Sequence, residues 1–228
     1  MNNIDLVIMA GGEGTRLHPF TKIVPKVLLY VDGKSMLEHT VDFFRGQGVG
    51  KIYLLTKYKS NLVRAYMDYS GIEDVEIIEE ETPMGTAGGL SLIGDRLSSQ
   101  FFVSNCDMMV DVDLKELVDG HAQDGINISI VSFNKPVSVP YGIFEFDDEG
   151  EIIDFLEKPT IQLWANAGVY LMDHSVFEYI KPGRMNMDEL FHAMLNSGSH
   201  VRVVPIGENS FKDIGEFKYY KKVLEEMR

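Results

Sequence analysis

The chain has 228 residues and a formal net charge of −14, with 45% hydrophobic and 25% charged residues. This profile is typical of a globular protein, and the acidic balance argues against a broad surface that binds nucleic acid. A single cysteine excludes an internal disulfide, and no Cys/His pattern has zinc-finger spacing. No apolar run approaches the ~20 residues that span a bilayer, and no secretory signal is recognisable. We therefore expect a cytoplasmic protein that does not bind membranes.

Strands and helices alternate in the first half of the sequence. Apolar runs predict strands at Ile4–Met9, Lys51–Leu55, Val75–Ile78 and Phe101–Ser104. Helical spacing of apolar residues predicts helices at Ser35–Arg45, Asn61–Tyr69 and Thr86–Leu97. Ser35 and Glu38 stand in capping-box register at the start of the first of these helices. The alternation indicates an α/β fold of the doubly wound, Rossmann-like type, with a mostly parallel sheet covered on both faces.

The pattern changes after about residue 125. Strands are predicted at Asn127–Phe133, Gly142–Asp147, Glu151–Leu156, Val169–Met172 and Val201–Val204, and helices at Asp188–Leu195 and Glu216–Met227. Short connections, including a hairpin turn at residues 147–150, make this half partly antiparallel. Because no linker separates the halves, residues 1–228 are expected to form one domain, with halves of about 1–125 and 126–228.

A glycine-rich loop follows the first predicted strand. Gly11, Gly12 and Gly14 would let backbone N–H groups approach an anion, although a simple tight turn explains them equally well. Leu17 breaks the dinucleotide-binding fingerprint, and no P-loop lysine follows, so a nicotinamide oxidoreductase is disfavoured. Arg16 in the loop and Lys26, at the end of a segment that Pro19 and Pro25 stiffen, together suit a polyphosphate ligand.

The segment from Gly11 to Lys26 resembles the GGxGTRLxPxTxxxPK signature of the sugar-1-phosphate nucleotidylyltransferases. The pattern is most similar to the short, mannose- or heptose-1-phosphate guanylyltransferase-like members. This resemblance implies the nucleotide-diphospho-sugar transferase fold and an enzyme that makes an NDP-sugar and pyrophosphate from an NTP and a sugar 1-phosphate. Mg²⁺ is the implied cofactor, and the reaction is an in-line attack on the α-phosphate. The implied setting is the synthesis of a bacterial surface glycan.

The resemblance also implies roles for individual residues. Arg16, Lys26 and Asp107 are the expected catalytic residues, and Asp107 and Asp213 the expected metal ligands. The nucleotide is expected to contact Ala10, Gly11, Gly12, Gly14, Thr15, Glu80, Pro83, Gly85, Thr86, Gly88 and Asn105. The sugar phosphate is expected to contact Tyr141, Gly142, Glu157, Lys158, Asn166 and Gly168.

Several alternatives stay open at this point. The P-x-G-T-A-G form of residues 83–88 favours GTP, but CTP or UTP would fit the same reaction. A further alternative is a module that binds a nucleotide sugar without catalysing a reaction. The chain could also form a homo-oligomer. Cys106 stands where relatives usually have glycine, and nothing nearby gives it a defined base for covalent catalysis. Glu157 and Lys158 alone would read as an exposed ion pair, and Asp113 as a helix cap.

Overall fold

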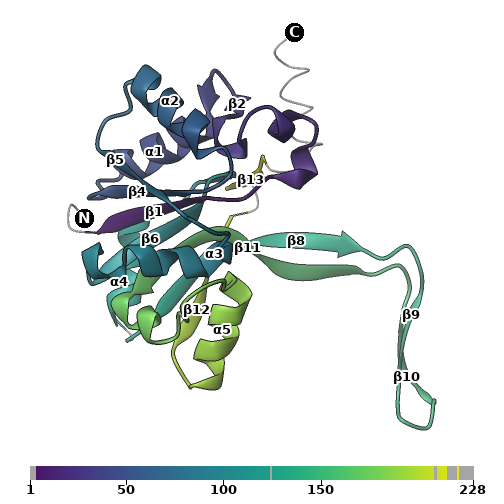
Figure 1. Ribbon diagram of the computed structural model, residues 1–228. Helices are drawn as coiled ribbons and strands as arrows, with labels where there is room; N and C mark the ends of the chain where they lie inside the picture. Colours follow the sequence, from purple (N-terminus) through teal and green to yellow (C-terminus); the bar gives the residue numbers. More distant parts are fainter. Residues whose placement is uncertain (1–3, 124, 208–209, 215–219, 221–228) are drawn as a thin grey trace.

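The computed structural model describes residues 4–123, 125–207, 210–214 and 220. Its body is a seven-stranded sheet in the order β12-β8-β11-β6-β1-β4-β5 (Figure 1). The strands of this sheet are β1 (Asp5–Ala10), β4 (Ile52–Thr56), β5 (Val75–Glu79), β6 (Gln100–Asn105), β8 (Ile128–Ser138), β11 (Thr160–Asp173) and β12 (Val201–Ile206). Only β11 runs antiparallel to its neighbours, and the other pairs are parallel. The predicted mixed, mostly parallel sheet is thus confirmed.

Two hydrophobic clusters cover the two faces of this sheet. One face packs against α1 (Met36–Gly46), α2 (Ser60–Ser70) and α4 (Leu114–Gln123), and the other against α3 (Gly85–Gly88) and α5 (Met187–Asn196). The alternation of side chains along β1 explains the division, because Leu6 and Ile8 enter the first cluster and Val7 the second. Short 3-10 turns complete the helical elements: η1 (Thr15–Leu17), η2 (Phe20–Lys22), η3 (Lys26–Leu28), η4 (Gly89–Leu92), η5 (Gly94–Arg96) and η6 (His174–Glu178).

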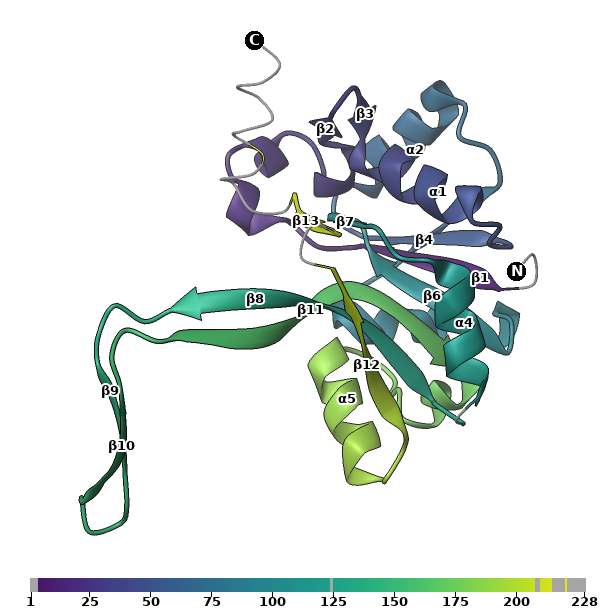
Figure 2. The same cartoon turned by 180° about the vertical axis from the view of Figure 1, so that it is seen from behind.

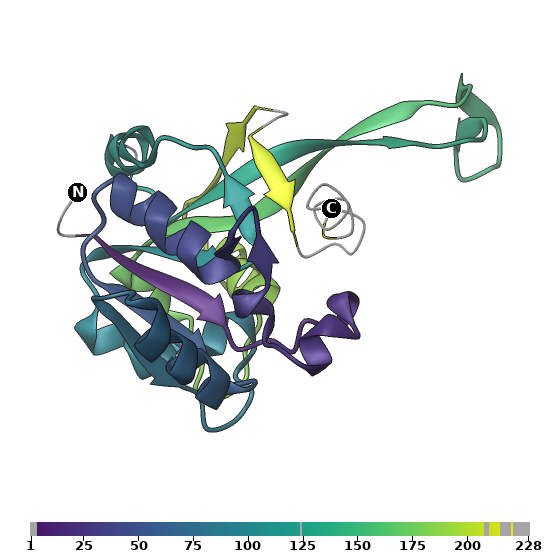
Figure 3. The same ribbon diagram turned by 90° about the horizontal axis from the view of Figure 1, so that it is seen from above.

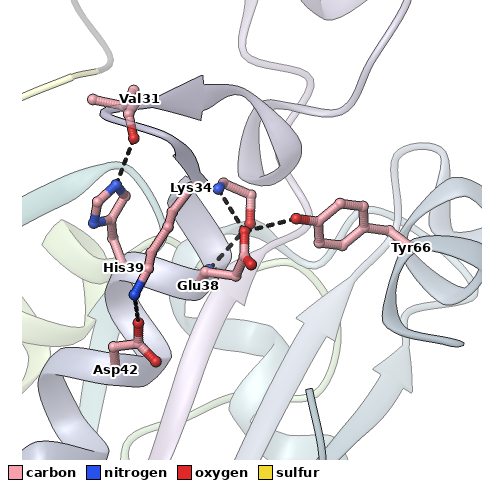
Figure 4. Close-up of polar contacts among 7 residues, drawn as sticks. Val31, Lys34, Glu38, His39, Asp42 and Tyr66 are labelled. Carbon is pink, nitrogen blue, oxygen red and sulfur yellow. Dashed lines mark hydrogen bonds and ion pairs between the residues drawn. The ribbon is translucent and has the colours of Figure 1, made fainter. Parts of the chain in front are cut away.

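The start of α1 confirms the predicted capping box. The Glu38 amide donates to Ser35 Oγ at 3.2 Å, and the Ser35 amide donates to Glu38 Oε2 at 2.6 Å (Figure 4). The same carboxylate accepts the Tyr66 hydroxyl at 2.7 Å, which ties the first turn of α1 to the middle of α2. Local sequence signals therefore fix where α1 begins and how it meets α2.

One predicted helix is absent from the structure, and one observed helix was not predicted. Residues 86–97 do not form one helix, because the chain breaks into α3, η4 and η5. Gly88, Gly89 and Gly94 lower helix propensity there, and close packing on other segments dictates the path of the chain. In addition, α4 was not predicted as a helix. Its cap was foreseen, since Asp113 Oδ1 accepts the amides of Lys115 and Glu116.

The second half of the chain carries a long arm. Both β8 and β11 are longer than predicted, and their paired far ends leave the sheet as a two-stranded ribbon. Beyond an elbow, β9 (Ile143–Phe146) and β10 (Ile152–Leu156) form an antiparallel hairpin that lies clear of the sheet and its helices (Figures 2 and 3). The predicted turn closes this hairpin, with the Asp147 amide donating to the Glu151 carbonyl at 3.1 Å. We call residues 134–164 the arm.

Smaller pairs of strands complete the described chain. β2 (Tyr30–Val31) pairs with β3 (Lys34–Ser35), and β7 (Met108–Val110) pairs with β13 (Phe211–Asp213). Apart from residue 220, the helix predicted at residues 216–227 lies outside the described residues. Among those described, no helix has the length and apolar character needed to cross a bilayer.

Candidate functional site

A cleft of about 720 Å³ lies beyond the carboxyl ends of β1, β4 and β6. In open α/β sheets this edge is where ligands bind. The cleft collects five cationic side chains in a chain of net charge −14: Arg16, Lys26, Lys57, Lys59 and Arg184. Three carboxylates, those of Glu13, Glu80 and Asp107, also line the cleft, so cations outnumber them by two and the cleft favours an anionic ligand locally, against the sign of the whole molecule.

The glycine-rich loop shapes one wall of this cleft. Gly14 has φ +64°, and a Cβ there would lie 3.1 Å from Lys26 Cβ and 3.0 Å from Thr21 Cγ2. The Thr21 hydroxyl donates to the Gly14 carbonyl at 2.9 Å. Glycine at position 14 thus provides both the left-handed backbone and the space in which Lys26 passes beneath the loop.

Lys26 and Asp107 form a buried ion pair on the floor of the cleft. Lys26 Nζ donates to Asp107 Oδ2, and the two side chains are only 12% and 7% exposed. Asp107 follows β6, and Lys26 comes from the excursion after β1. The sequence predicted that both residues are catalytic but gave no sign that they touch, and the structure shows this contact.

The backbone of β13 lies beside Asp107. Asp213 pairs with Met108 in the β13–β7 register, and the Ile214 amide donates to the Asp107 carbonyl at 3.2 Å. The side chain of Asp213 lies outside the described residues. Asp107 directly precedes β7 and Asp213 is the last residue of β13, its neighbour, and hard carboxylate oxygens are the donors that Mg²⁺ takes. Their chemistry and register therefore fit the predicted metal site.

Glu80 is a buried carboxylate that lines the cleft after β5. Only 3% of Glu80 is exposed, and its Oε2 accepts the Met84 amide at 3.1 Å. Burial raises the pKa of this carboxyl, while the Met84 hydrogen bond acts to lower it. A Cβ at Gly89 would lie 2.7 Å from Oε1 and one at Gly11 3.2 Å from it, so both glycines make room for this group.

The loop that follows Glu80 is fastened to the segment before α5. Gly85 has φ +76°, and a Cβ on it would lie 2.4 Å from the Met185 carbonyl oxygen. A Cβ on Gly88 would lie 2.3 Å from the Gly183 carbonyl oxygen. Thr86 Oγ1 accepts the Met187 amide at 2.8 Å. These contacts hold α3 and its loop at the rim of the cleft.

Most residues predicted to bind the nucleotide lie together in this cleft. The lining includes Gly11, Gly12, Gly14, Thr15, Arg16, Lys26, Glu80, Pro83, Gly85, Thr86, Asn105 and Asp107. Ala10 and Gly88 do not line it. Ala10 is buried at the end of β1, and Gly88 packs against residues 183–185.

The residues predicted to bind the sugar phosphate fall into two groups. Gly168 has φ +72°, and a Cβ there would lie 2.6 Å from Asn105 Nδ2. Asn166 Oδ1 accepts the Gly168 amide at 2.8 Å, so both residues lie on β11 beside the end of β6. The other four lie at the elbow of the arm and do not line the cleft: Tyr141, Gly142, Glu157 and Lys158. From Asn166 to the first residue of β11 the extended chain alone spans ~20 Å.

Sequence reasoning missed several cleft residues, four of which have polar side chains and come from outside the motifs it singled out. Lys57, Tyr58 and Lys59 follow β4 directly, and Arg184 comes from the segment that fastens α3. Tyr58 donates its hydroxyl to the Thr21 carbonyl at 3.1 Å, and Lys59 donates to the Ile23 carbonyl at 3.0 Å. The position of residues 57–59 at a strand's carboxyl end was the available signal. Nothing in the sequence pointed to Arg184.

Cys106 is buried beside Asp107. Burial, and to a smaller extent the Asp107 charge, together raise the pKa of its thiol to about 12. The thiolate is the nucleophilic form of cysteine, so this thiol is inert at neutral pH. The hypothesis of covalent cysteine catalysis gains no support.

Curated proteins of similar sequence are mannose-1-phosphate guanylyltransferases. A mannose-1-phosphate guanylyltransferase from Mycobacterium tuberculosis is 30% identical over 223 residues, which cover 94% of this chain and 62% of that protein. A mannose-1-phosphate guanyltransferase from Candida albicans is 34% identical over 186 residues, covering 77% of this chain and 51% of that protein. The chain thus spans between half and two thirds of the length of these relatives.

Solved structures show the same fold. The crystal structure of HddC from Yersinia pseudotuberculosis superposes with a TM-score of 0.74 at 24% identity, covering 99% of this chain and all of that one. The family model described as nucleotidyl transferase matches residues 6–228. The chain therefore belongs to the nucleotidyl transferase family.

Proposed function

We propose that this protein joins an NTP to a sugar 1-phosphate, giving an NDP-sugar and pyrophosphate. The observation that carries the proposal is one cleft in which a glycine loop, two predicted phosphate-binding cations and Asp107 meet. The names of the relatives support the same reaction class. Because one sheet runs through both halves of the chain, we also propose that they act as a single domain.

The reaction needs alignment and charge neutralisation rather than a protein nucleophile. An oxygen of the sugar phosphate attacks the α-phosphorus, and the bond to pyrophosphate breaks in line with that attack. Arg16 stabilises the charge that develops on pyrophosphate, and Lys26 neutralises the phosphates from beneath the loop. The glycine amides allow the phosphate chain to lie close to the backbone.

Mg²⁺ is the proposed cofactor, held by Asp107 and Asp213. When bound it would offset phosphate charge at the reacting centre. Lys26 already pairs with Asp107, so a bound metal ion would compete with the ammonium for this carboxylate. Lys26 is therefore suited to turn from Asp107 toward the phosphates when the substrate is present.

GTP is the proposed nucleotide, and Glu80 is the proposed reader of its base. Guanine presents two neighbouring donors, N1–H and the N2 amino group, and an ionised carboxylate accepts two such bonds side by side. Adenine and the pyrimidines lack this pair of donors. A buried carboxylate on the cleft wall, flanked by two glycines, supports this assignment.

Among the residues proposed to bind the sugar phosphate, the two on β11 are the best supported. Asn166 and Gly168 lie beside Asn105, which itself lines the cleft. The roles of Tyr141, Gly142, Glu157 and Lys158 stay predictions, since the elbow must approach the cleft for them to contact the sugar phosphate.

Pyrophosphate release tests the proposed function directly. The purified protein with Mg²⁺ is given GTP, CTP, UTP, ATP or dTTP, each with mannose, glucose, heptose and aminosugar 1-phosphates. Release with GTP and one sugar 1-phosphate is the expected result. Release with CTP or UTP alone would keep the reaction and refute the reading of Glu80. Nucleotide binding without release from any pair would favour the silent binding module.

A further inference from the structure

Lys57 lines the cleft but belongs neither to the glycine loop nor to the metal site. It follows β4 directly, and Glu80 follows β5 in the same way. The two strands are parallel neighbours, and their register pairs Thr56 with Glu79. The next residues along them are Lys57 and Glu80, so an ammonium group and a buried carboxyl leave adjacent strands at the same edge of the sheet.

Hydrogen bonds continue this pairing past the ends of the two strands. The Glu80 amide donates to the Thr56 carbonyl at 2.9 Å, and Lys57 Nζ donates to the Glu81 carbonyl. The Lys57 ammonium is therefore held beside the backbone of the residue that follows Glu80. Because β4 lies between β1 and β5, Lys57 stands between the glycine loop and Glu80.

Uncharged groups form the immediate surroundings of the Glu80 carboxyl. Gly11 of the glycine loop and Gly89 of η4 flank it, and the Met84 amide donates to Oε2 at 3.1 Å. Burial raises the pKa of this carboxyl, and the Met84 hydrogen bond and the Lys57 charge both lower it. The ammonium therefore favours the ionised carboxylate against the effect of burial.

The other titratable groups around Glu80 fall into two sets. Its neighbours in sequence are Glu79, which pairs with Arg64 on α2, and Glu81, which is exposed. The other charged and phenolic side chains of the described cleft lining are those of Glu13, Arg16, Lys26, Tyr58, Lys59, Asp107 and Arg184. Among the described residues, Lys57 is the one whose charge acts on the pKa of Glu80.

We propose that Lys57 is a positioning residue that sets base choice by keeping Glu80 ionised, the form that accepts two hydrogen bonds from guanine. This inference rests on the proposed function, with Glu80 as the reader of the base. A protonated carboxyl presents one donor and one acceptor, which suits the ring nitrogen and amino group on the pairing edge of adenine. Loss of the Lys57 charge therefore lets Glu80 take up a proton at higher pH and moves the site from guanine toward adenine.

Two substitutions separate the charge of Lys57 from its hydrogen bond. Lys57→Gln removes the charge but keeps a donor for the Glu81 carbonyl, whereas Lys57→Arg keeps both. Lys59→Gln is the matched control. It removes an equal charge from a cleft residue that donates to the Ile23 carbonyl at 3.0 Å.

The experiment measures the dissociation constants of GDP and ADP by calorimetry with Mg²⁺, from pH 5.5 to 8.5. The ratio of the two constants is the readout, because protonation of the phosphates or of the phosphate-binding side chains affects both nucleotides alike. We expect the preference for GDP to fall with decreasing pH, and to fall at a higher pH in Lys57→Gln than in wild type, Lys57→Arg or Lys59→Gln. Where the profiles differ most, the ratio should be on the order of 10-fold lower in Lys57→Gln, and at pH 8.5 the profiles should converge.

Three outcomes would overturn this inference. They are a wild-type chain that prefers ADP or neither nucleotide at every pH, a Lys57→Gln profile that coincides with that of wild type, and an equal shift in Lys59→Gln. A coinciding Lys57→Gln profile would assign Lys57 to fastening the loop through its hydrogen bond alone. The binding ratio needs no turnover, so these results are independent of pyrophosphate release, whose absence would refute the proposed reaction instead.

Discussion

Replacing Glu80 by glutamine tests how the cleft selects its base. The change keeps the size of the side chain but leaves one acceptor and one donor where the carboxylate had acceptors only. Against guanine, the amide NH₂ would meet a donor of the base, and one of two paired hydrogen bonds is lost. A bidentate base contact is worth about 1–3 kcal/mol of discrimination. We therefore expect kcat/KM for GTP to fall about 10- to 100-fold and the preference over ATP to narrow.

The assay is continuous pyrophosphate release, with GTP and ATP each varied at saturating sugar 1-phosphate and Mg²⁺. Glu81→Gln is the matched control. Glu81 is the next residue, is exposed and does not line the cleft, so this substitution makes the same chemical change outside the site. A Glu80→Gln enzyme that keeps its GTP preference, with kcat/KM within threefold of wild type, would refute the assignment.

The stability of the same variant separates base reading from folding. Burial raises the pKa of Glu80, so the folded state holds this proton more tightly than the unfolded chain. The resulting stabilisation is complete below the ordinary glutamate pKa and is lost as pH rises through the raised value. At pH 7–8 the ionised group thus opposes folding, and glutamine should leave Tm unchanged or higher. A Tm several degrees lower would instead indicate a structural role.

Three further predictions follow from the cleft and its supports. Arg16→Ala should lower turnover by ~10³ with little change in Tm, measured by pyrophosphate release, and near-normal turnover would remove Arg16 from the catalytic set. Cys106→Ala should keep kcat, and iodoacetamide at pH 8 should leave the wild-type thiol unmodified by mass spectrometry, because the pKa of about 12 keeps it protonated. Gly85→Ala should lower the free energy of unfolding in urea well beyond Gly71→Ala: both glycines have positive φ, but only Gly85 faces a carbonyl oxygen, whereas Gly71 faces open space. If both variants lose the same free energy of unfolding, ~1–2 kcal/mol, backbone strain alone accounts for the effect of both substitutions.

The sequence predicted the sheet well because its strands are short, apolar and bounded by turn signals. Ile4–Met9 and Phe101–Ser104 differ from β1 and β6 by one residue at each end. The helix expected at residues 86–97 failed for a tertiary reason, since Gly85 and Gly88 are chosen for close approach to residues 183–185 and not for helix formation. No local pattern reveals a contact of this kind.

The candidate site was predictable where its residues come from one contiguous motif. The glycine loop, Arg16 and Lys26 lie in 16 consecutive positions, Gly11 to Lys26, and the structure brings them to one cleft. Lys57 and Lys59 were missed because isolated lysines after a strand look like solvated surface residues. The path of the arm was equally hidden, because the lengths of β8 and β11 depend on their pairing with each other over residues 132–138 and 160–166.

The close fit between α3 and residues 183–185 has a consequence for engineering this fold. Two carbonyl oxygens, those of Met185 and Gly183, occupy the space where side chains at positions 85 and 88 would stand. A loop from a relative, placed at residues 82–89 to change the accepted base, would pack against residues 183–185, whose shape fits the present loop. Altered nucleotide choice should therefore be sought by exchanging residues 82–89 and 183–187 as one cassette, with both halves taken from the same donor.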